Sequence, residues 1–169
     1  DAVPFIIEES PRDGRGRPQL RFDYLAEMRR ILEWRSASTV LLGEANVVPK
    51  ETLPYFGQGG ANGIHMMFNF FVNQHLFYAL ASGDTRPLIA AIRATGRIPV
   101  LAHWAQFLRN HDELDLGRLK KPQRARVFER FGPERRMQLY ERGIRRRLPP
   151  ILGDRRHLEL AYSILFALP

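Results

Sequence analysis

Residues 107–116 read FLRNHDELDL, and this stretch joins an apolar segment to four polar side chains in a row. The apolar part is typical of a buried strand, and it is followed directly by Asn110, His111, Asp112 and Glu113. An amide, an imidazole and two carboxylates at the end of a strand predict a candidate functional site. A polar turn closed by an Asx hydrogen bond is the alternative that the same residues allow.

Short apolar segments alternate with amphipathic segments along the chain. The apolar segments predict strands at residues 2–7, 39–42, 65–71 and 104–108. The spacing of apolar residues predicts helices at 18–34, 72–82, 86–94, 122–131, 134–147 and 154–167. Short buried strands separated by helices are typical of α/β proteins in which helices cover a parallel sheet. The predicted fold class is therefore α/β with parallel strands.

Functional side chains in such folds gather where the strands end. Glu44 and Asn46 follow one predicted strand, and His111 and Asp112 follow another. Asp1 directly precedes the apolar residues AVPFII, so any strand that it ends would lie upstream of this chain. Taken without further context, Glu44 could also cap a helix or form an ion pair.

Composition limits the class of protein. The chain has 169 residues, of which 44% are hydrophobic, and this is enough for the core of one domain. Cysteine is absent, which excludes disulfides and thiolate metal sites. No apolar run reaches the roughly 18 residues of a membrane helix, so we expect a soluble, cytoplasmic protein without a membrane partner. The net charge of +8 permits polyanion binding, but no nucleic-acid motif accompanies it, and a solvated basic surface is the alternative.

Several segments together carry a family resemblance. In order and spacing, DAVPFIIE at 1–8, LLGEANVVP at 41–49, HMMFNF at 65–70 and FLRNHDEL at 107–114 resemble signature segments of the α-amylase family of glycoside hydrolases. GIRRRLPPIL at 143–152 continues the resemblance, which covers essentially the whole chain. Within that family, the chain is most similar to the trehalose synthases (maltose α-D-glucosyltransferases).

The resemblance implies a (β/α)8 TIM-type barrel whose retaining active site contains three carboxylates. Such a barrel takes about 250 residues, so residues 1–169 are expected to form its C-terminal half. This half would run roughly from the end of strand 4 to the helix before strand 8. The chain would then be an incomplete catalytic domain, inactive without the remaining half of the barrel from the parent chain. The resemblance leaves the oligomeric state open.

The resemblance also implies a role for each acid. Asp1 matches the nucleophile, Glu44 matches the general acid/base, and Asp112 matches the acid that stabilises the transition state. His111, beside Asp112, matches a ligand of a sugar hydroxyl. A retaining mechanism requires an ionised carboxylate that attacks the anomeric carbon and a protonated acid that assists departure of the leaving group.

Calcium is the cofactor that the resemblance implies, and no organic cofactor is expected. Its ligands would include the main-chain oxygens of Phe5 and Ile6 and the carboxylate of Glu8, because oxygen ligands suit calcium. An ordinary loop acid is the alternative for Glu8. The histidines are too dispersed along the sequence for a zinc site, and we expect His75 and His157 on helix surfaces.

Three functions are compatible with the sequence. The first is interconversion of maltose and trehalose, in which the freed glucose re-attacks a covalent glucosyl-enzyme through a different hydroxyl. The second is hydrolysis of α-glucosides by the same residues, and Val47 and Val48 keep it open because typical trehalose synthases have an aromatic-containing segment there. The third is a basic non-catalytic module, which would bind a polyanion or a protein partner in a salt-dependent way.

Overall fold

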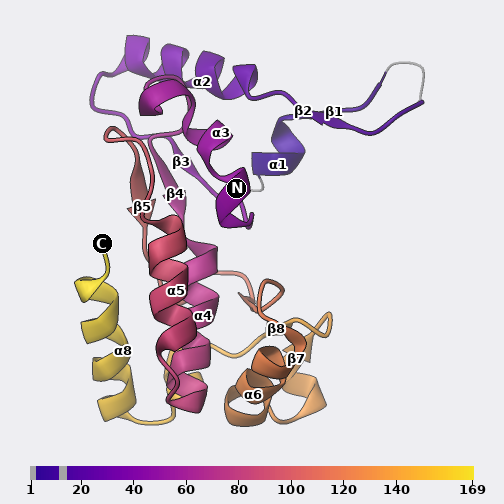
Figure 1. Ribbon diagram of the computed structural model, residues 1–169, viewed down its shortest axis with the longest axis vertical. Helices are drawn as coiled ribbons and strands as arrows, with labels where there is room; N and C mark the ends of the chain where they lie inside the picture. The colour runs from indigo at the N-terminus through magenta and orange to yellow at the C-terminus, as the bar shows by residue number, and fades with distance from the viewer. Residues whose placement is uncertain (1–2, 12–14) are drawn as a thin grey trace. The chain divides into compact units, whose positions relative to one another are not determined.

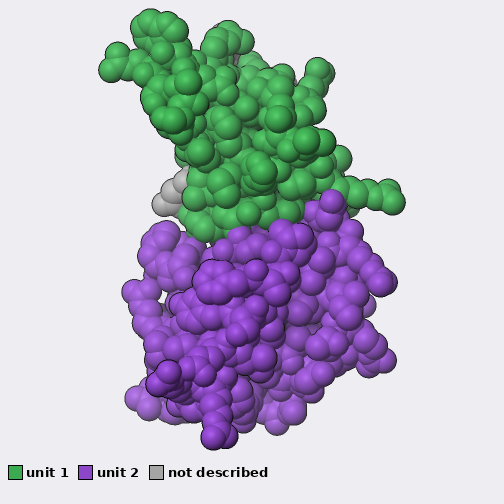
Figure 2. All heavy atoms as spheres, turned by 90° about the vertical axis from the view of Figure 1, so that its left-hand side faces the viewer, with its two compact units in different colours: residues 1–68, 97–105 green, residues 69–96, 106–169 purple. Residues whose placement is uncertain are grey.

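A computed structural model describes residues 3–11 and 15–169 of the chain (Figure 1). The chain divides into two compact units, which Figure 2 shows in different colours. Unit 1 comprises residues 1–68 and 97–105, and unit 2 comprises residues 69–96 and 106–169. Asp1, which the sequence predicts as the nucleophile, lies outside the described residues.

Unit 1 contains a three-stranded parallel sheet in the order β3–β4–β5. The strands are β3 (Leu42–Gly43), β4 (Met66–Phe68) and β5 (His103–Ala105). Leu42 pairs with Met66, and Met66 pairs with His103, so three of the segments predicted as strands lie side by side. The prediction of parallel strands is confirmed for this unit, although each strand is shorter than predicted.

The segment at residues 2–7 is not a strand, and that prediction is wrong. Val3–Ile6 forms the short helix α1, and the Ile7 N–H donates to the Val3 carbonyl at 3.2 Å to close its turn. Pro4 favours this conformation because the fixed φ of proline suits the first turn of a helix. A short apolar run does not distinguish a strand from a buried helix, and the burial of Val3 and Ile7 explains the apolar pattern.

The remaining described part of unit 1 contains an antiparallel ribbon and several helical segments. In the ribbon, β1 (Glu8–Glu9) pairs with β2 (Gln19–Leu20). The helix predicted at 18–34 is confirmed in part by α2 (Asp23–Arg35), but its predicted first turn is wrong, because Gln19–Leu20 belongs to β2. The connection from β3 to β4 contains η1 (Pro49–Glu51), α3 (Leu53–Phe56) and η2 (Gln58–Gly60). The helices α1, α2 and α3 and the sheet contribute to one core, formed by Val3, Ile7, Leu25, Ala45, Tyr55, Phe56, Ile64, Met67 and Ala102.

Unit 2 is built around the apolar helix α4 (Phe70–Ser82), which packs against α5 (Arg86–Thr95) and α6 (Lys121–Phe131). Asn69 caps the start of α4, where its side chain accepts a hydrogen bond from the Val72 N–H at 3.1 Å. Farther along the chain, α7 (Leu148–Leu152) packs against α8 (Arg155–Ala167). The helices predicted at 72–82, 86–94, 122–131 and 154–167 are confirmed. Within the described ranges, no helix is long and apolar enough to span a membrane.

The helix predicted at 134–147 is wrong. This segment forms the turn η3 (Arg135–Met137) and a hairpin of β7 (Gln138–Leu139) and β8 (Gly143–Ile144). β8 also pairs antiparallel with β6 (Leu114–Asp115), which gives the sheet order β6–β8–β7. A Cβ atom at Gly143 would lie 2.6 Å from Cγ of Glu113, so only glycine lets the chains approach this closely. Pairing with β6 therefore outweighs the local helical propensity of the segment.

His75 lies in the core and not on the helix surface predicted for it. The residue is 8% exposed, its Nδ1 lies 2.7 Å from the Phe71 carbonyl oxygen, and its ring contacts the Phe71 ring. Burial lowers the pKa of His75, because the imidazolium form loses its solvation. The prediction fails because α4 is buried on nearly all sides, which leaves little surface for a polar residue. His157 is exposed as predicted, with Nδ1 2.8 Å from the Asp154 carboxylate.

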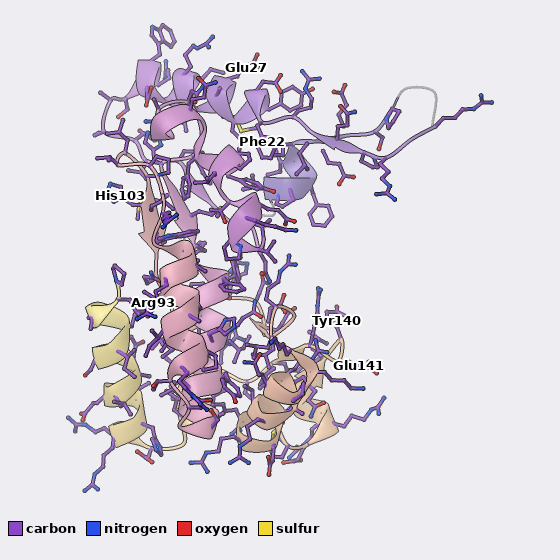
Figure 3. All side chains as sticks on the ribbon, in the orientation of Figure 1. Phe22, Glu27, Arg93, His103, Tyr140 and Glu141 are labelled. Atoms are coloured by element: carbon purple, nitrogen blue, oxygen red, sulfur yellow. The ribbon has the colours of Figure 1, made fainter. Side chains whose placement is uncertain are left out.

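The turn between β7 and β8 contains two residues in the left-handed conformation, Tyr140 with φ 52° and Glu141 with φ 55° (Figure 3). The Arg142 N–H donates to the Leu139 carbonyl at 3.1 Å and closes the turn. Two consecutive residues with positive φ are the feature of a type I′ turn, which favours Asn and Gly. Tyr140 and Glu141 are therefore strained in this turn.

We expect Glu141→Gly to stabilise the protein by about 1 kcal/mol, because a left-handed residue with a Cβ atom costs that much. Thermal unfolding should show a higher Tm for this variant than for the wild type. Glu27→Gly is the control, since Glu27 is exposed within α2 and glycine inside a helix should lower the stability by about 1 kcal/mol. A Glu141→Gly variant that unfolds at the wild-type temperature would contradict the expectation.

Candidate functional site

Glu44 lies at the carboxyl end of the parallel sheet in unit 1. It follows β3 directly, and because Gly43 pairs with Met67, Glu44 is level with the last residue of β4. Glu44 is half-buried, and its main-chain oxygen accepts a hydrogen bond from the Val3 N–H at 2.9 Å. The next helical turn begins only at Pro49 and has Val48 as its N-cap, so Glu44 is not the N-cap of that turn. This is the position at which parallel α/β folds carry functional side chains.

The residues on both sides of Glu44 are buried and hold its backbone in place. A Cβ atom at Gly43 would lie 2.4 Å from Cδ1 of Ile64, which is 1% exposed, so the glycine allows β3 to approach this core side chain. On the other side, Ala45 is 3% exposed and belongs to the same core. The small residues in LLGEAN thus fix the main chain that carries the Glu44 carboxylate.

In unit 2, His111 and Asp112 lie together on a loop. Nε2 of His111 is 3.5 Å from Oδ2 of Asp112, and the two side chains are 67% and 55% exposed. Farther along the segment, the Asp115 carboxylate accepts the Gly117 N–H at 2.6 Å and forms an Asx turn. A polar turn at the NHDE run stays the alternative to a binding role. Asp112 and His111 are both available to bind hydroxyl groups of a ligand.

Two buried amides of α4 hold the chain before and after this loop. Asn73 Nδ2 donates to the carbonyl oxygens of Phe107 at 2.7 Å and Leu108 at 3.0 Å. Gln74 Oε1 accepts the Arg118 N–H at 2.7 Å. Because Asn73 and Gln74 are 3% and 0% exposed, water cannot replace these partners, and losing one would leave a buried polar group unpaired.

Arg109 connects the loop to the segment that follows β8. Its Nε donates to the Arg146 carbonyl at 3.1 Å, and its Nη1 donates to the Asn110 carbonyl at 3.0 Å. Burial lowers the pKa of Arg109, and the nearby cation of Arg147 adds to this effect. Carboxylates of the loop act in the opposite direction, because they favour the charged guanidinium.

The residues expected to bind calcium lie in unit 1, where α1 ends and β1 begins. Phe5 and Ile6 are in the last turn of α1, whose carbonyl groups have no partner within the helix. Among the described residues, no donor is bonded to either of these two oxygens. Glu8 begins β1 and is exposed. Two main-chain oxygens and a carboxylate are the donor types that calcium prefers, so this donor set fits the ion.

Sequence patterns give little indication of the residues that hold the His111–Asp112 loop. Asn73 and Gln74 leave one signal, since they begin a polar run inside an otherwise apolar helix. Arg109 leaves none, because the chain contains 26 basic residues and this one is not distinguished by its neighbours. Its partners are main-chain carbonyl groups, which no pattern of side chains identifies.

Comparison with known proteins finds relatives along the whole chain, although no family model matches it. The chain is 38% identical over 170 residues to a trehalose synthase from Thermus thermophilus, covering 99% of this chain and 17% of that protein. It is 34% identical over 172 residues to the trehalose synthase/amylase TreS of Mycobacterium tuberculosis, covering 100% and 28%. It is also 34% identical over 177 residues to a trehalose synthase from Pimelobacter sp., covering 100% and 30%. The chain thus spans less than a third of the length of these curated relatives.

Asn73→Leu should destabilise the protein by about 1–3 kcal/mol, because it leaves the carbonyl groups of Phe107 and Leu108 without their donor. Chemical denaturation of the two proteins measures this difference. Ser163→Ala is the control, since it removes a hydrogen bond to the Glu159 carbonyl on the exposed side of α8. It should change the stability by less than about 0.5 kcal/mol. Similar losses in both variants would contradict the role of Asn73.

Proposed function

We propose that this chain, which its similarity along the whole length identifies as a segment of the trehalose synthase family, is part of an enzyme that transfers glucosyl groups on α-linked disaccharides. The proposed reaction is the interconversion of maltose and trehalose through a covalent glucosyl-enzyme. The observation that carries the proposal is the 38% identity over 99% of the chain to a protein named trehalose synthase. Its substrates would be maltose, trehalose or other α-glucosides, and the remaining half of the barrel would come from the parent chain.

Asp1 is proposed to be the nucleophile and Glu44 the general acid/base of the reaction at the anomeric carbon. Asp1 attacks this carbon while Glu44 gives its proton to the departing glycosidic oxygen, and Glu44 then takes a proton from the hydroxyl that attacks the ester. In retaining enzymes the two carboxyl groups lie about 5–5.5 Å apart. The place of Glu44 directly after a parallel strand supports its role, because barrel enzymes carry their catalytic groups at strand ends.

Asp112 and His111 are proposed to hold the sugar ring. Positive charge develops on the ring in the transition state, and hydrogen bonds from its hydroxyls to an ionised carboxylate strengthen as this happens. The exposure of both side chains and their separation of 3.5 Å support this role, because neighbouring hydroxyls of one sugar can reach both groups. Asp112 would therefore act mainly on kcat, and His111 would contribute to substrate binding as well.

Hydrolysis of α-glucosides is the second candidate, and the name of one relative favours it. The Mycobacterium tuberculosis protein, 34% identical to this chain, is named trehalose synthase/amylase. In hydrolysis, water attacks the glucosyl-enzyme in place of the glucose hydroxyl, and Glu44 takes the proton from the water. The two reactions use the same residues and differ in their products, so product analysis separates them.

A calcium ion near the end of α1 is a further part of the proposal. Phe5 and Ile6 would supply main-chain oxygens and Glu8 would supply a carboxylate, with further oxygen ligands completing the usual 6–8. A bound ion would stabilise the connection between α1 and β1. The role proposed for the ion is structural, because none of these residues is among the proposed catalytic acids.

The proposal is tested by incubating the full-length parent protein with maltose. Trehalose as the product supports transfer, glucose alone supports hydrolysis, and the absence of turnover contradicts both. Glu44→Gln should lower kcat by about 10²- to 10⁴-fold, because general acid–base assistance is typically worth that factor. Glu27→Gln, an exposed substitution on α2 (Figure 3), is the matched control and should keep the wild-type rate. A fully active Glu44→Gln enzyme would show that another group donates the proton.

Removal of calcium should lower the Tm of the full-length protein, because an ion that binds only the folded state stabilises it by mass action. We expect Glu8→Gln to weaken the ion's binding, so that a calcium chelator shifts the Tm of this variant less than that of the wild type. Glu27→Gln should respond to the chelator as the wild type does. Elemental analysis that finds no calcium, together with a Tm that the chelator leaves unchanged, would refute the site.

A further inference from the structure

We propose that Arg147 is a positioning residue, which acts on the reaction by holding the loop that carries His111 and Asp112. This inference rests on the proposed function, since that function gives Asp112 and His111 their roles. It adds a residue outside the NHDE segment and assigns it a specific task. The task is to fix the main chain at Asn110 and His111.

The hydrogen bonds of Arg147 point to this task. Its Nη1 donates to the carbonyl oxygens of both Asn110 and His111, at 3.3 Å in each case. These are the two residues that directly precede Asp112. A guanidinium bonded to both carbonyl groups restricts the rotation of the peptide units from which the His111 and Asp112 side chains emerge. The contact is with the main chain only, so it occupies neither the imidazole nor the carboxylate.

A second guanidinium acts on the same carbonyl group. Arg109 also donates to the Asn110 oxygen, at 3.0 Å, and its Nε donates to the Arg146 carbonyl at 3.1 Å. The bonds therefore run both ways between the loop and the segment after β8, from Arg147 to the loop and from Arg109 to Arg146. Each bond restricts movement of the loop relative to the segment after β8. Together they therefore define the position of the loop more closely than either bond could alone.

The segment that carries Arg147 is itself held firmly. The Arg146 Nη1 donates to the Phe131 carbonyl at 3.0 Å, at the end of α6. Arg147 lies immediately before α7, and the next residue, Leu148, is 7% exposed and packs in the core. A group that positions a loop must be less mobile than the loop, and these contacts satisfy that condition.

The three arginines at 145–147 make different contacts, and Arg145 can therefore serve as a matched control for Arg147. Arg147 holds the loop and Arg146 holds the end of α6. Arg145 is exposed, and its main-chain N–H donates to the Met137 carbonyl at 2.9 Å. Replacing the Arg145 side chain removes the same charge two residues away and leaves that bond in place.

The test uses the full-length parent protein with maltose as the substrate. Arg147→Gln should lower kcat by about 10- to 100-fold with a smaller change in KM, because a displacement of about 1 Å at a reacting group can cost 10²-fold. Arg147→Lys should restore little of the lost rate, because an ammonium group does not reproduce the planar, directional donors of a guanidinium. Arg145→Gln should keep the wild-type kcat.

A double-mutant cycle with Asp112→Asn distinguishes positioning from a general loss of stability. If Arg147 acts through the loop, Arg147→Gln should lower the rate by less than about threefold when Asp112 is already replaced, because groups that act as a unit are not additive. Fully additive losses would overturn the proposal, and so would an Arg147→Gln enzyme with wild-type kcat beside an impaired Asp112→Asn enzyme. If Asp112→Asn keeps the wild-type kcat, or the wild type does not turn over maltose, the proposed function fails and the positioning role fails with it.

Discussion

The antiparallel pairing of Leu114 with Ile144 is the contact on which the arrangement of unit 2 around the candidate loop depends. It aligns the strand that leaves the NHDE segment with the strand that leads into the three arginines. The Leu116 N–H extends this alignment by donating to the Arg142 carbonyl at 2.6 Å. Because the register is fixed here, Arg147 lies within hydrogen-bonding distance of the loop. A shift by one residue would reverse the direction of every side chain on β8 and would move Ile144, which is fully buried, out of the core.

Main-chain carbonyl groups are the common acceptors in the support of this loop. Asn73, Arg109 and Arg147 each donate to carbonyl oxygens between residues 107 and 111 or in the adjoining arginine segment. Support of this kind determines the position of the backbone without using the side chains of His111 and Asp112. These two side chains therefore remain exposed beside each other, which suits their proposed role of binding sugar hydroxyls.

Unit 1 positions Glu44 by a different principle, through the burial of apolar residues and the register of a parallel sheet. Gly43 and Ala45 are buried on either side of Glu44, and the pairing of Gly43 with Met67 fixes its height at the carboxyl end of the sheet. The hydrogen bond from Val3 to the Glu44 oxygen joins α1 to the same point. The motif LLGEAN thus combines strand-forming residues, small residues that permit close packing and one acid whose place is set by the sheet.

The sequence by itself determined the elements whose patterns are local. Helical spacing predicted α4, α5, α6 and α8, and apolar runs predicted β3, β4 and β5. It also carried the family resemblance, which comparison with relatives confirmed. Each of these features depends on residues close together in the chain, where periodicity and motif are directly visible.

Only the tertiary structure decided the features that depend on distant partners. Residues 134–147 form a hairpin because β8 pairs with β6, and residues 3–6 form a helix although their apolar run also suits a strand. His75 is buried because neighbouring elements cover α4 on nearly all sides. Arg109 and Arg147 acquire their roles from carbonyl groups more than 30 residues away in the chain. The acceptors of these bonds are main-chain carbonyl groups, which every residue has. Because the acceptor does not depend on residue type, no sequence pattern predicts these bonds.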